Sequence, residues 1–306
     1  MAIEAKAFCP GHITSFFVIC DAPIDPLLKG SKGAGFSIQH GVISRVNVAP
    51  SNRTSVEISV NGEKREANVT ETVARLALDL ALQKHGQEYD VKIRQETQIP
   101  VGAGYGASGA AALSTSLALN QALNLGLTKN KSAQLAHIAE VTHKTGLGDV
   151  IAQNAGGVEI RTKPGAPGYG QVDTIPSACD FVVVCGSAGR LETKEVLSNP
   201  EKRKKINEAG DRLVKELLKD ASIERLVSLS KKFALQTGLA SQTVINTIRS
   251  LEVSGYDYCS MVMLGQSVFC FVNEEDAEDA SKIIKECMPS GIVFVSRIDN
   301  VGARLI

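Results

Sequence analysis

The stretch IPVGAGYGASGAAALSTSLALN, from Ile99 to Asn120, places three alternate glycines directly before a run of small residues that favours a helix. Glycine adopts positive φ easily and lets the backbone approach a ligand closely, while the first N–H groups of a helix have no partner within it. The helix dipole adds positive potential there, so the stretch predicts an anion site that needs no lysine. Between Glu96 and Glu140 the chain contains no Asp or Glu that would repel a phosphate.

Three patterns compete for these glycines. Gly104, Gly106 and Gly109 satisfy G-x-G-x-x-G, but a dinucleotide site also needs an acidic residue about 20 positions later, where this chain has none. The pattern G-x-x-x-x-G-K-[ST] fails because no lysine follows the glycines. A phosphate loop that starts with proline remains, and a plain turn with a tight helix contact is its structural alternative. The predicted nucleotide-binding residues are Pro100, Gly102, Gly104, Gly106, Ala107, Ser108 and Gly109.

Length and charge narrow the class of protein. The 306 residues suffice for two domains, and a Pro- and Gly-rich segment predicts a division into residues 1–170 and 171–306. The 33 basic and 33 acidic side chains balance, which argues against nucleic acid or an anionic membrane as partner and favours a small molecule. No apolar run approaches the roughly 20 residues that cross a bilayer, and the first residues lack a leader pattern, so we expect a cytoplasmic protein. Seven cysteines without a C-x-x-C pair and five scattered histidines indicate neither a zinc site nor disulfides.

Two segments near the start of the chain are candidates for a substrate pocket. In CPGHITSFF, the Pro-Gly pair is predicted to end a first strand and to present His12 and Thr14 at a pocket edge, although Pro-Gly is also ordinary turn chemistry. In KGSKGAGFSIQHGV, Gly33 and Gly35 are predicted to form a flexible loop that lines the pocket, ahead of a hairpin that turns near His40. Hairpin chemistry explains these glycines equally well.

The first carboxylates after the glycine loop are Glu140 and Asp149, which lie on two different predicted elements. Such a pair suits a division of labour in which one carboxylate holds a metal ion and the other orients or deprotonates a hydroxyl. Asp149 could instead be only a helix N-cap, and Glu140 only a charge on a helix surface.

The second half of the chain opens with the strand FVVVCG. Later, two strands flank Gly265, and a helix and two short strands finish the chain. The charged run EKRKKINEAGDR predicts a solvated helix face. The helices expected between these strands are Pro200 to Lys219, Ile223 to Thr237 and Ser241 to Glu252.

Taken together, these motifs resemble the GHMP kinase superfamily of small-molecule kinases. CPGHITSFF is similar to its first signature, PVGAGYGAS to its phosphate loop, and GLGDVIAQNAGG to its aspartate motif. The third signature is reduced to SMVMLGQSVFCF, with Gly265 as its remnant. The resemblance implies an α+β protein with the GHMP kinase fold, in which a ribosomal-S5-like N-terminal domain precedes a ferredoxin-like C-terminal domain.

Within the superfamily, PGHITSFF, GSKGAG, GAGYGASGA, HKTGLGDV and SMVMLG are most similar to the archaeal pantoate kinases of coenzyme A biosynthesis. This resemblance implies phosphorylation of the 4-hydroxyl of (R)-pantoate with ATP and Mg²⁺. By position, Ser108 would contact Mg²⁺ or a phosphate, Glu140 would be the metal carboxylate, and Asp149 would be the catalytic base. The chain departs from the superfamily pattern in having His12 for a common lysine, Ala107 for the first serine, and a different offset for Glu140.

The chemistry of the reaction suggests further roles. Lys144 could keep Asp149 ionised and contact the transferring phosphate. The acceptor carboxylate needs a cation, for which the sequence offers several candidates without choosing between them: His12, Lys29, Lys32, Arg161 and Arg190. The predicted substrate-binding residues are His12, Thr14, Gly33, Gly35 and Arg161. Other acceptors such as homoserine, shikimate or mevalonate stay open, as do a catalytically silent ATP-binding sensor and a homodimeric assembly.

Overall fold

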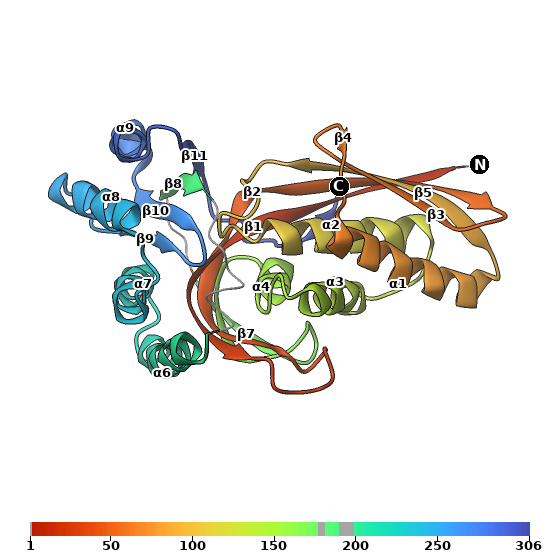
Figure 1. Ribbon diagram of the computed structural model, residues 1–306, viewed down its shortest axis with the longest axis horizontal. Coiled ribbons are helices and arrows are strands. Elements are labelled where there is room, and N and C mark those ends of the chain that lie inside the picture. The colour runs from red at the N-terminus through yellow and green to blue at the C-terminus, as the bar shows by residue number, and fades with distance from the viewer. Residues whose placement is uncertain (1, 177–180, 190–198) are drawn as a thin grey trace.

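Two long antiparallel strands, β1 (Ile3–Cys20) and β2 (Gly30–Ser51), curve through the centre of the molecule (Figure 1). The computed structural model describes residues 2–176, 181–189 and 199–306. β1 and β2 belong to a larger sheet in the order β12-β1-β2-β5-β3-β4, with β6 paired to β2 and β7 paired to β6. The other strands of this sheet are β3 (Ser55–Val60), β4 (Glu63–Lys64), β5 (Glu88–Thr97), β6 (Val158–Lys163), β7 (Gln171–Ile175) and β12 (Arg304–Leu305).

Helices cover one side of the larger sheet and enclose an apolar core with it. α2, the predicted helix after the glycine loop, is buried along most of its length because its small residues let it pack closely on β1 and β2. α1 ends at Gly86, whose left-handed φ of 63° caps the helix, as is common for glycine at this position. The helices of this half are α1 (Asn68–His85), α2 (Ala107–Ala122), α3 (Lys129–His143) and α4 (Asp149–Ala155).

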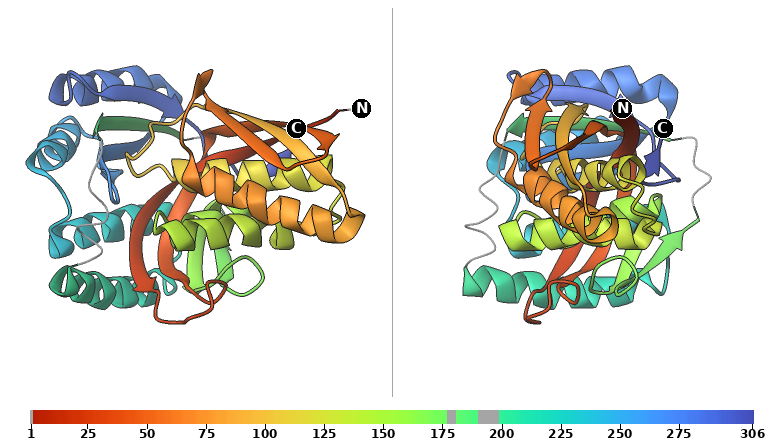
Figure 2. Two further views of the ribbon diagram at one scale, coloured as in Figure 1. Left: turned by 45° about the vertical axis from the view of Figure 1, so that its right-hand side comes forward. Right: turned by 90° about the vertical axis from the view of Figure 1, so that its right-hand side faces the viewer.

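A smaller sheet in the order β11-β8-β10-β9 lies at the other end of the molecule. The left view of Figure 2 separates its teal and blue helices from α1, in orange. The division at residues 170 and 171 stays a prediction; β7 lies in the larger sheet, and β12 returns from the C-terminus to pair with β1. The elements of this half are β8 (Val182–Gly189), α6 (Pro200–Leu217), α7 (Ile223–Thr237), α8 (Gln242–Val253), β9 (Cys259–Val262), β10 (Gln266–Val272), the 3-10 turn η1 (Glu274–Asp276), α9 (Ala277–Cys287) and β11 (Ile292–Ser296).

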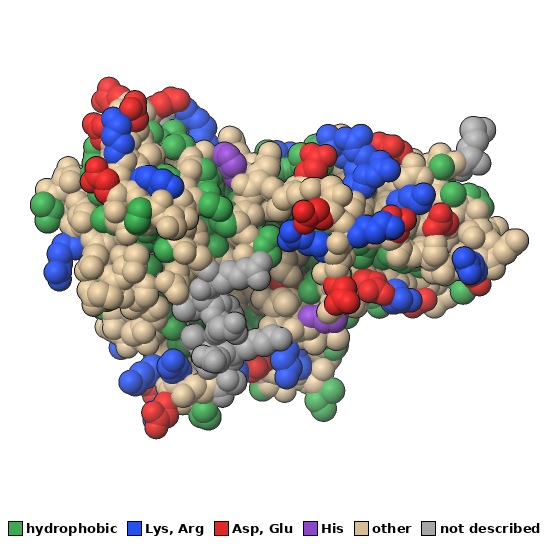
Figure 3. Space-filling view, turned by 45° about the horizontal axis from the view of Figure 1, so that its top comes forward, with side chains coloured by type: hydrophobic (Ala, Val, Ile, Leu, Met, Phe, Trp, Pro, Cys, Tyr) green, Lys and Arg blue, Asp and Glu red, His purple; other side chains and the backbone are tan. Residues whose placement is uncertain are grey.

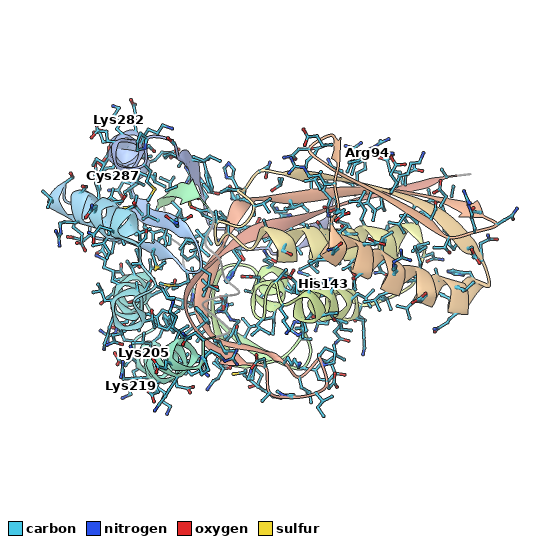
Figure 4. The ribbon with its side chains drawn as sticks, in the orientation of Figure 1. Arg94, His143, Lys205, Lys219, Lys282 and Cys287 are labelled. Carbon is cyan, nitrogen blue, oxygen red and sulfur yellow. The ribbon has the colours of Figure 1, made fainter. Side chains whose placement is uncertain are left out.

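The surface agrees with the balanced composition. Basic and acidic side chains intermingle on the face shown in Figure 3. The charged run at the start of α6 is the expected solvated face. Lys205 is exposed on it (Figure 4), whereas the next residue, Ile206, is buried in the core. In the described parts of the chain, no helix combines the length and apolar character needed to span a bilayer.

The turn expected at Pro10-Gly11 and the hairpin expected near His40 are both wrong. β1 continues through this point, and β2 carries two extra residues opposite it, so the pair forms a bulge rather than a turn. A bulge tolerates proline because the ladder is already interrupted there. His12 and Thr14 therefore lie inside a central strand.

A second bulge in β1 lies at Ser15, between Thr14 and Phe16. One extra residue reverses which side chains face which side of the sheet. As a result, Thr14, Phe17 and Ile19 line the same cavity although their spacing is not strictly alternate.

Candidate active site

A cavity of about 640 Å³ lies where the glycine loop, the start of α4 and the central strands meet. It brings together segments that are far apart in the sequence. The predicted site residues that line it are Thr14, Gly102, Gly104, Gly106, Ala107, Ser108, Glu140, Lys144, Asp149 and Arg161. A wider hollow over β3, β4 and the start of α1 contains none of these residues.

The glycine loop has the geometry that an anion cradle requires. Gly106, with φ of 65°, is the N-cap of α2, so the first N–H groups of this helix face the loop without helical partners. Gly104 has φ of 89°, and a Cβ there would lie 2.7 Å from the carbonyl oxygen of Met263. A Cβ on Gly265 would lie 2.0 Å from the carbonyl oxygen of Ala103. The strand pair β9–β10 thus supports the loop through close backbone contact that only glycine permits.

Glu140 faces the cavity from the last turns of α3 and is only 2% exposed, so it is not a surface charge. Its Oε1 accepts hydrogen bonds from Ser108 Oγ at 2.5 Å and from Thr145 Oγ1 at 2.7 Å. Its Oε2 is buried and has no partner among the described residues. Burial is the main reason that the pKa of this carboxyl rises to about 7, with the two hydroxyl groups opposing the rise. The end of α3 is held in place by His143, whose Nε2 lies 2.8 Å from Thr72 Oγ1 on α1 (Figure 4).

An unpartnered buried carboxylate oxygen beside a hydroxyl is a donor set that fits Mg²⁺, which prefers oxygen ligands. Gly146 leaves the space in front of it open, because a Cβ there would lie 2.4 Å from Glu140 Oε2. The same Cβ would lie 3.2 Å from Asp149 Oδ2. The free oxygens of the two carboxylates therefore face one space.

Asp149 is the first residue of α4, and Gly148, not Asp149, occupies the N-cap position. The N-cap alternative is therefore wrong. Oδ1 of Asp149 lies 2.8 Å from Nδ1 of His12, and Nε2 of His12 lies 2.8 Å from Oε1 of Glu159. Arg161 Nη1 donates to that same Oε1 at 2.5 Å. These four residues, which we call the ionic chain, alternate carboxylates with cationic or protonatable groups.

His12 is fully buried at the centre of the ionic chain. Burial alone would lower the pKa of His12, but its hydrogen bonds to Asp149 and Glu159 more than offset this, and the net pKa is raised. As an imidazolium, His12 would donate one N–H to each carboxylate. Asp149 is thereby fixed at Oδ1, while its side chain keeps 25% of its surface exposed at the cavity.

Comparison with known proteins agrees with this geometry. The model of the GHMP kinases N terminal domain matches residues 70–157, which include the glycine loop, Glu140 and Asp149. The pantoate kinase of Thermococcus kodakarensis is 38% identical over 289 residues, which cover 92% of both chains. The chain belongs to the pantoate kinase family. The pantoate kinase of Methanocaldococcus jannaschii is also 38% identical, over 94% of this chain and all of the relative.

Solved structures of relatives support the family assignment. A structure described as a phosphotransferase related to the CoA biosynthesis pathway superposes with a TM-score of 0.88 at 34% identity, covering 100% of this chain and 99% of the other. Homoserine kinase from Cytophaga hutchinsonii superposes with a TM-score of 0.70 at 16% identity over 99% of this chain and 97% of the other. The second match shows the GHMP kinase fold alone. As a member of the pantoate kinase family, the chain is a small-molecule kinase of α+β fold.

Several residues that the sequence predicts for the site do not line the cavity. His12 bonds to the hidden side of Asp149. Gly33 and Gly35 lie within β2, and Gly109 packs against α4, where a Cβ would meet the side chain of Gln153 at 2.8 Å. Pro100 begins the loop without lining the cavity. The sequence favoured these positions because glycine and proline signal loops, whereas here the glycines serve close packing.

The expected cations are distributed differently as well. Lys144 lines the cavity but forms no ion pair with Asp149 in the described structure; His12 takes that place. Lys32 pairs with Asp211 on α6, and neither residue lines the cavity. Lys29 lines the cavity, and Arg190 lies outside the described residues.

Sequence reasoning missed Ser31, Thr145 and Arg203, which line the cavity, and Glu159, which lies behind it. Arg203 of α6 also pairs with Asp21 at 2.6 Å. Glu159 had one available signal: together with Arg161 it places two charges on one side of a strand that is otherwise buried.

Proposed function

We propose that this chain transfers the γ-phosphoryl group of ATP to the 4-hydroxyl of (R)-pantoate, giving ADP and 4-phosphopantoate in coenzyme A biosynthesis. One observation carries the proposal: Asp149 lines the same cavity as the glycine loop, which can bind an anion, and the buried Arg161. Its acceptor is taken from the relatives, which are pantoate kinases at 38% identity over more than nine tenths of this chain.

The nucleotide side of the cavity is formed by the glycine loop and the start of α2. Its free N–H groups suit the phosphates of ATP, because they donate to anions without competing internal bonds. Ser108 and Glu140 would hold Mg²⁺, which neutralises charge on the β- and γ-phosphates when bound. Lys144 lies in the same cavity wall and would add positive charge near the transferred group.

The acceptor side is centred on Arg161, which lines the cavity although it is only 1% exposed. Its Nε has no hydrogen-bond partner in the described structure, so the guanidinium keeps a donor for an anion. Ser31 is its neighbour: a Cβ on Gly148 would lie 2.1 Å from Ser31 Oγ and 3.0 Å from Arg161 Nε. We assign Arg161 and Ser31 to the carboxylate of pantoate.

Asp149 is the group that we assign to the acceptor hydroxyl. With Oδ1 engaged by His12, its free Oδ2 would accept the hydroxyl proton as the acceptor oxygen bonds to the γ-phosphorus and the bond from that phosphorus to the bridging oxygen of ADP breaks. Positioning and charge neutralisation supply the remainder of the rate enhancement in this chemistry.

An acceptor panel tests the proposal. ADP release would be followed with (R)-pantoate, (S)-pantoate, homoserine, shikimate and mevalonate, and ³¹P NMR would identify a phosphate monoester as product. We expect the highest kcat/KM with (R)-pantoate. A higher value with another hydroxy acid would assign the enzyme to that acceptor, and no turnover with any of them would favour an ATP-binding sensor.

A further inference from the structure

Three neighbouring strands build the acceptor side of the cavity. β1 and β6 flank the first part of β2, so that Gly35 lies between Thr14 and Glu159, and Gly33 lies between Phe17 and Arg161. Strands on either side of a common neighbour are about 10 Å apart, because adjacent strands are about 4.8 Å apart. Side chains of β1 and β6 can therefore meet only where β2 carries almost no side chain.

Gly33 and Gly35 provide that space. A Cβ on Gly35 would lie 2.7 Å from His12 Nε2 and 3.1 Å from Glu159 Oε1, and a Cβ on Gly33 would lie 3.1 Å from Arg161 Nη2. The two glycines thus allow Glu159 and Arg161 to reach across β2 towards His12.

Within the ionic chain, Glu159 bonds both to His12, the partner of Asp149, and to Arg161. Its Oε1 lies 2.8 Å from His12 Nε2 and accepts from Arg161 Nη1 at 2.5 Å, and its side chain is fully buried. In the described structure, the charged groups bonded to His12 are Asp149 from α4 and Glu159 from β6, and Arg161 Nη1 lies 3.4 Å from its Nε2. On β1 itself, the uncharged Thr14 places its Oγ1 3.5 Å from His12 Nδ1.

We propose that Glu159 is a positioning residue, which fixes Asp149 through His12 and Arg161 directly, and so sets the distance between the base and the carboxylate-binding group. The inference rests on the proposed function, because it assigns Asp149 and Arg161 to the two ends of one acceptor. Glu159 does not line the cavity, so it acts through these neighbours. Glu159 lies between His12 and Arg161. Without its charge, a protonated His12 and Arg161 would repel each other, and Asp149 alone would remain to balance two buried cations.

Glu159→Gln tests this role, because glutamine keeps the shape of the side chain and removes its charge. We expect kcat to fall about 10²-fold, the cost of misplacing a reacting group by about 1 Å, and KM for pantoate to rise about 10-fold, while KM for ATP stays within about twofold. In ¹⁵N NMR spectra of the free enzyme, the His12 ring is expected to be doubly protonated at neutral pH in the wild type and singly protonated in the variant. Wild-type kcat and KM for pantoate in the variant would overturn the proposal.

Ile160→Val is the matched control. Ile160 lies between Glu159 and Arg161 but points to the opposite side of β6, where it is 2% exposed in the apolar core. Loss of one methylene should lower the melting temperature slightly and leave kcat, KM and the His12 spectrum unchanged. An equal kinetic loss in this control would mean that the Glu159 effect is only one of stability, and would overturn the positioning role.

Glu159→Asp keeps the proposal testable if the glutamine variant does not fold. It retains the charge and shortens the side chain by one methylene, so His12 should stay doubly protonated while kcat and KM for pantoate shift in the same directions by smaller factors. Unchanged kinetics in this variant would contradict the proposal. If the wild type prefers another acceptor, the proposed function fails, and the same variants measured with that acceptor still decide the role of Glu159.

Discussion

The nucleotide side and the acceptor side of the cavity each contain a carboxylate, and the two carboxylates have opposite kinds of partner. On the nucleotide side, Glu140 has only the hydroxyl groups of Ser108 and Thr145 as partners, and one of its oxygens is unpartnered among the described residues. On the acceptor side, Asp149 bonds to His12, which bonds in turn to Glu159. The first carboxylate lacks a cationic partner in the described structure, whereas the second is paired with a buried imidazole whose pKa is raised.

This difference bears on the roles of the two carboxylates. A buried carboxylate without a cation is costly when ionised, unless a metal ion arrives with the ligand. A carboxylate that is hydrogen-bonded on one oxygen still has a second oxygen that can accept a proton. Environments that differ in this way are what the proposed roles require, with Glu140 as metal ligand and Asp149 as base. The following substitutions would break or sharpen that assignment.

The largest effect is expected for Asp149→Asn. Asparagine keeps the size of the side chain and can accept from His12, but it has no basic oxygen. If Asp149 is the base, kcat should fall about 10²- to 10⁴-fold, with ATP affinity largely retained, as measured by ADP release and by nucleotide titration. Full turnover in the variant, under conditions where chemistry limits the rate, would remove Asp149 from the mechanism and leave positioning to account for catalysis.

Arg161→Lys should have the next largest effect. Lysine keeps the positive charge beside Glu159 but loses the planar group and its free Nε. A hydrogen bond between charged groups contributes about 1.5–3 kcal/mol, so KM for pantoate should rise about 10- to 100-fold while KM for ATP hardly changes. The Michaelis constants for pantoate and ATP, measured together, show which substrate Arg161 binds. A rise in KM for ATP alone would place Arg161 on the nucleotide side.

The two sides also differ in how far the sequence predicts them. The glycine loop, Ser108 and Asp149 lie within one stretch of the chain, so local spacing of residues was enough to propose a nucleotide site. The acceptor side depends on β1, β2 and β6 lying side by side, which no local pattern specifies. For that reason the local sequence places His12 at a substrate edge and does not link Glu159 to it. The helices of the second half were predicted well, because amphipathic spacing and the caps Asn199, Ser222 and Ser241 are local signals.

Ser108→Ala should have a smaller effect, confined to the nucleotide side. The variant loses one oxygen near the expected position of Mg²⁺ and one hydrogen bond to Glu140. A bond of this kind contributes about 0.5–1.5 kcal/mol, so the Mg²⁺ concentration for half-maximal activity should rise by up to about 10-fold. The melting temperature should hardly change, because alanine is the better helix former. An unaltered Mg²⁺ dependence would make Ser108 a residue of helix structure only.

The last expected effect has the opposite sign, and it concerns the stability of the metal-free protein rather than its activity. Glu140 has its pKa raised from 4.5 to about 7, so between these values the folded protein binds more protons than the unfolded chain. Stability from this group is complete below pH 4.5 and is lost as the pH rises through about 7. At pH 8 the buried carboxylate then costs roughly 3 kcal/mol, because a pKa difference of one between the folded and unfolded states corresponds to about 1.4 kcal/mol.

Glu140→Gln removes that cost, because glutamine does not ionise. The measured quantity is the melting temperature of the variant minus that of the wild type, both in EDTA. This difference should be a few degrees larger at pH 8 than at pH 5, since roughly 3 kcal/mol moves the midpoint of a protein of this size only modestly. The buried amide of glutamine affects stability at both pH values alike. Only the change in the melting-temperature difference between pH 5 and pH 8 therefore reports the ionisation of Glu140. Mg²⁺ at pH 8 should raise the melting temperature of the wild type and not of the variant. If the difference between variant and wild type were the same at both pH values, Glu140 would already be ionised and compensated in the free enzyme, and the contrast between the two sides of the cavity would disappear.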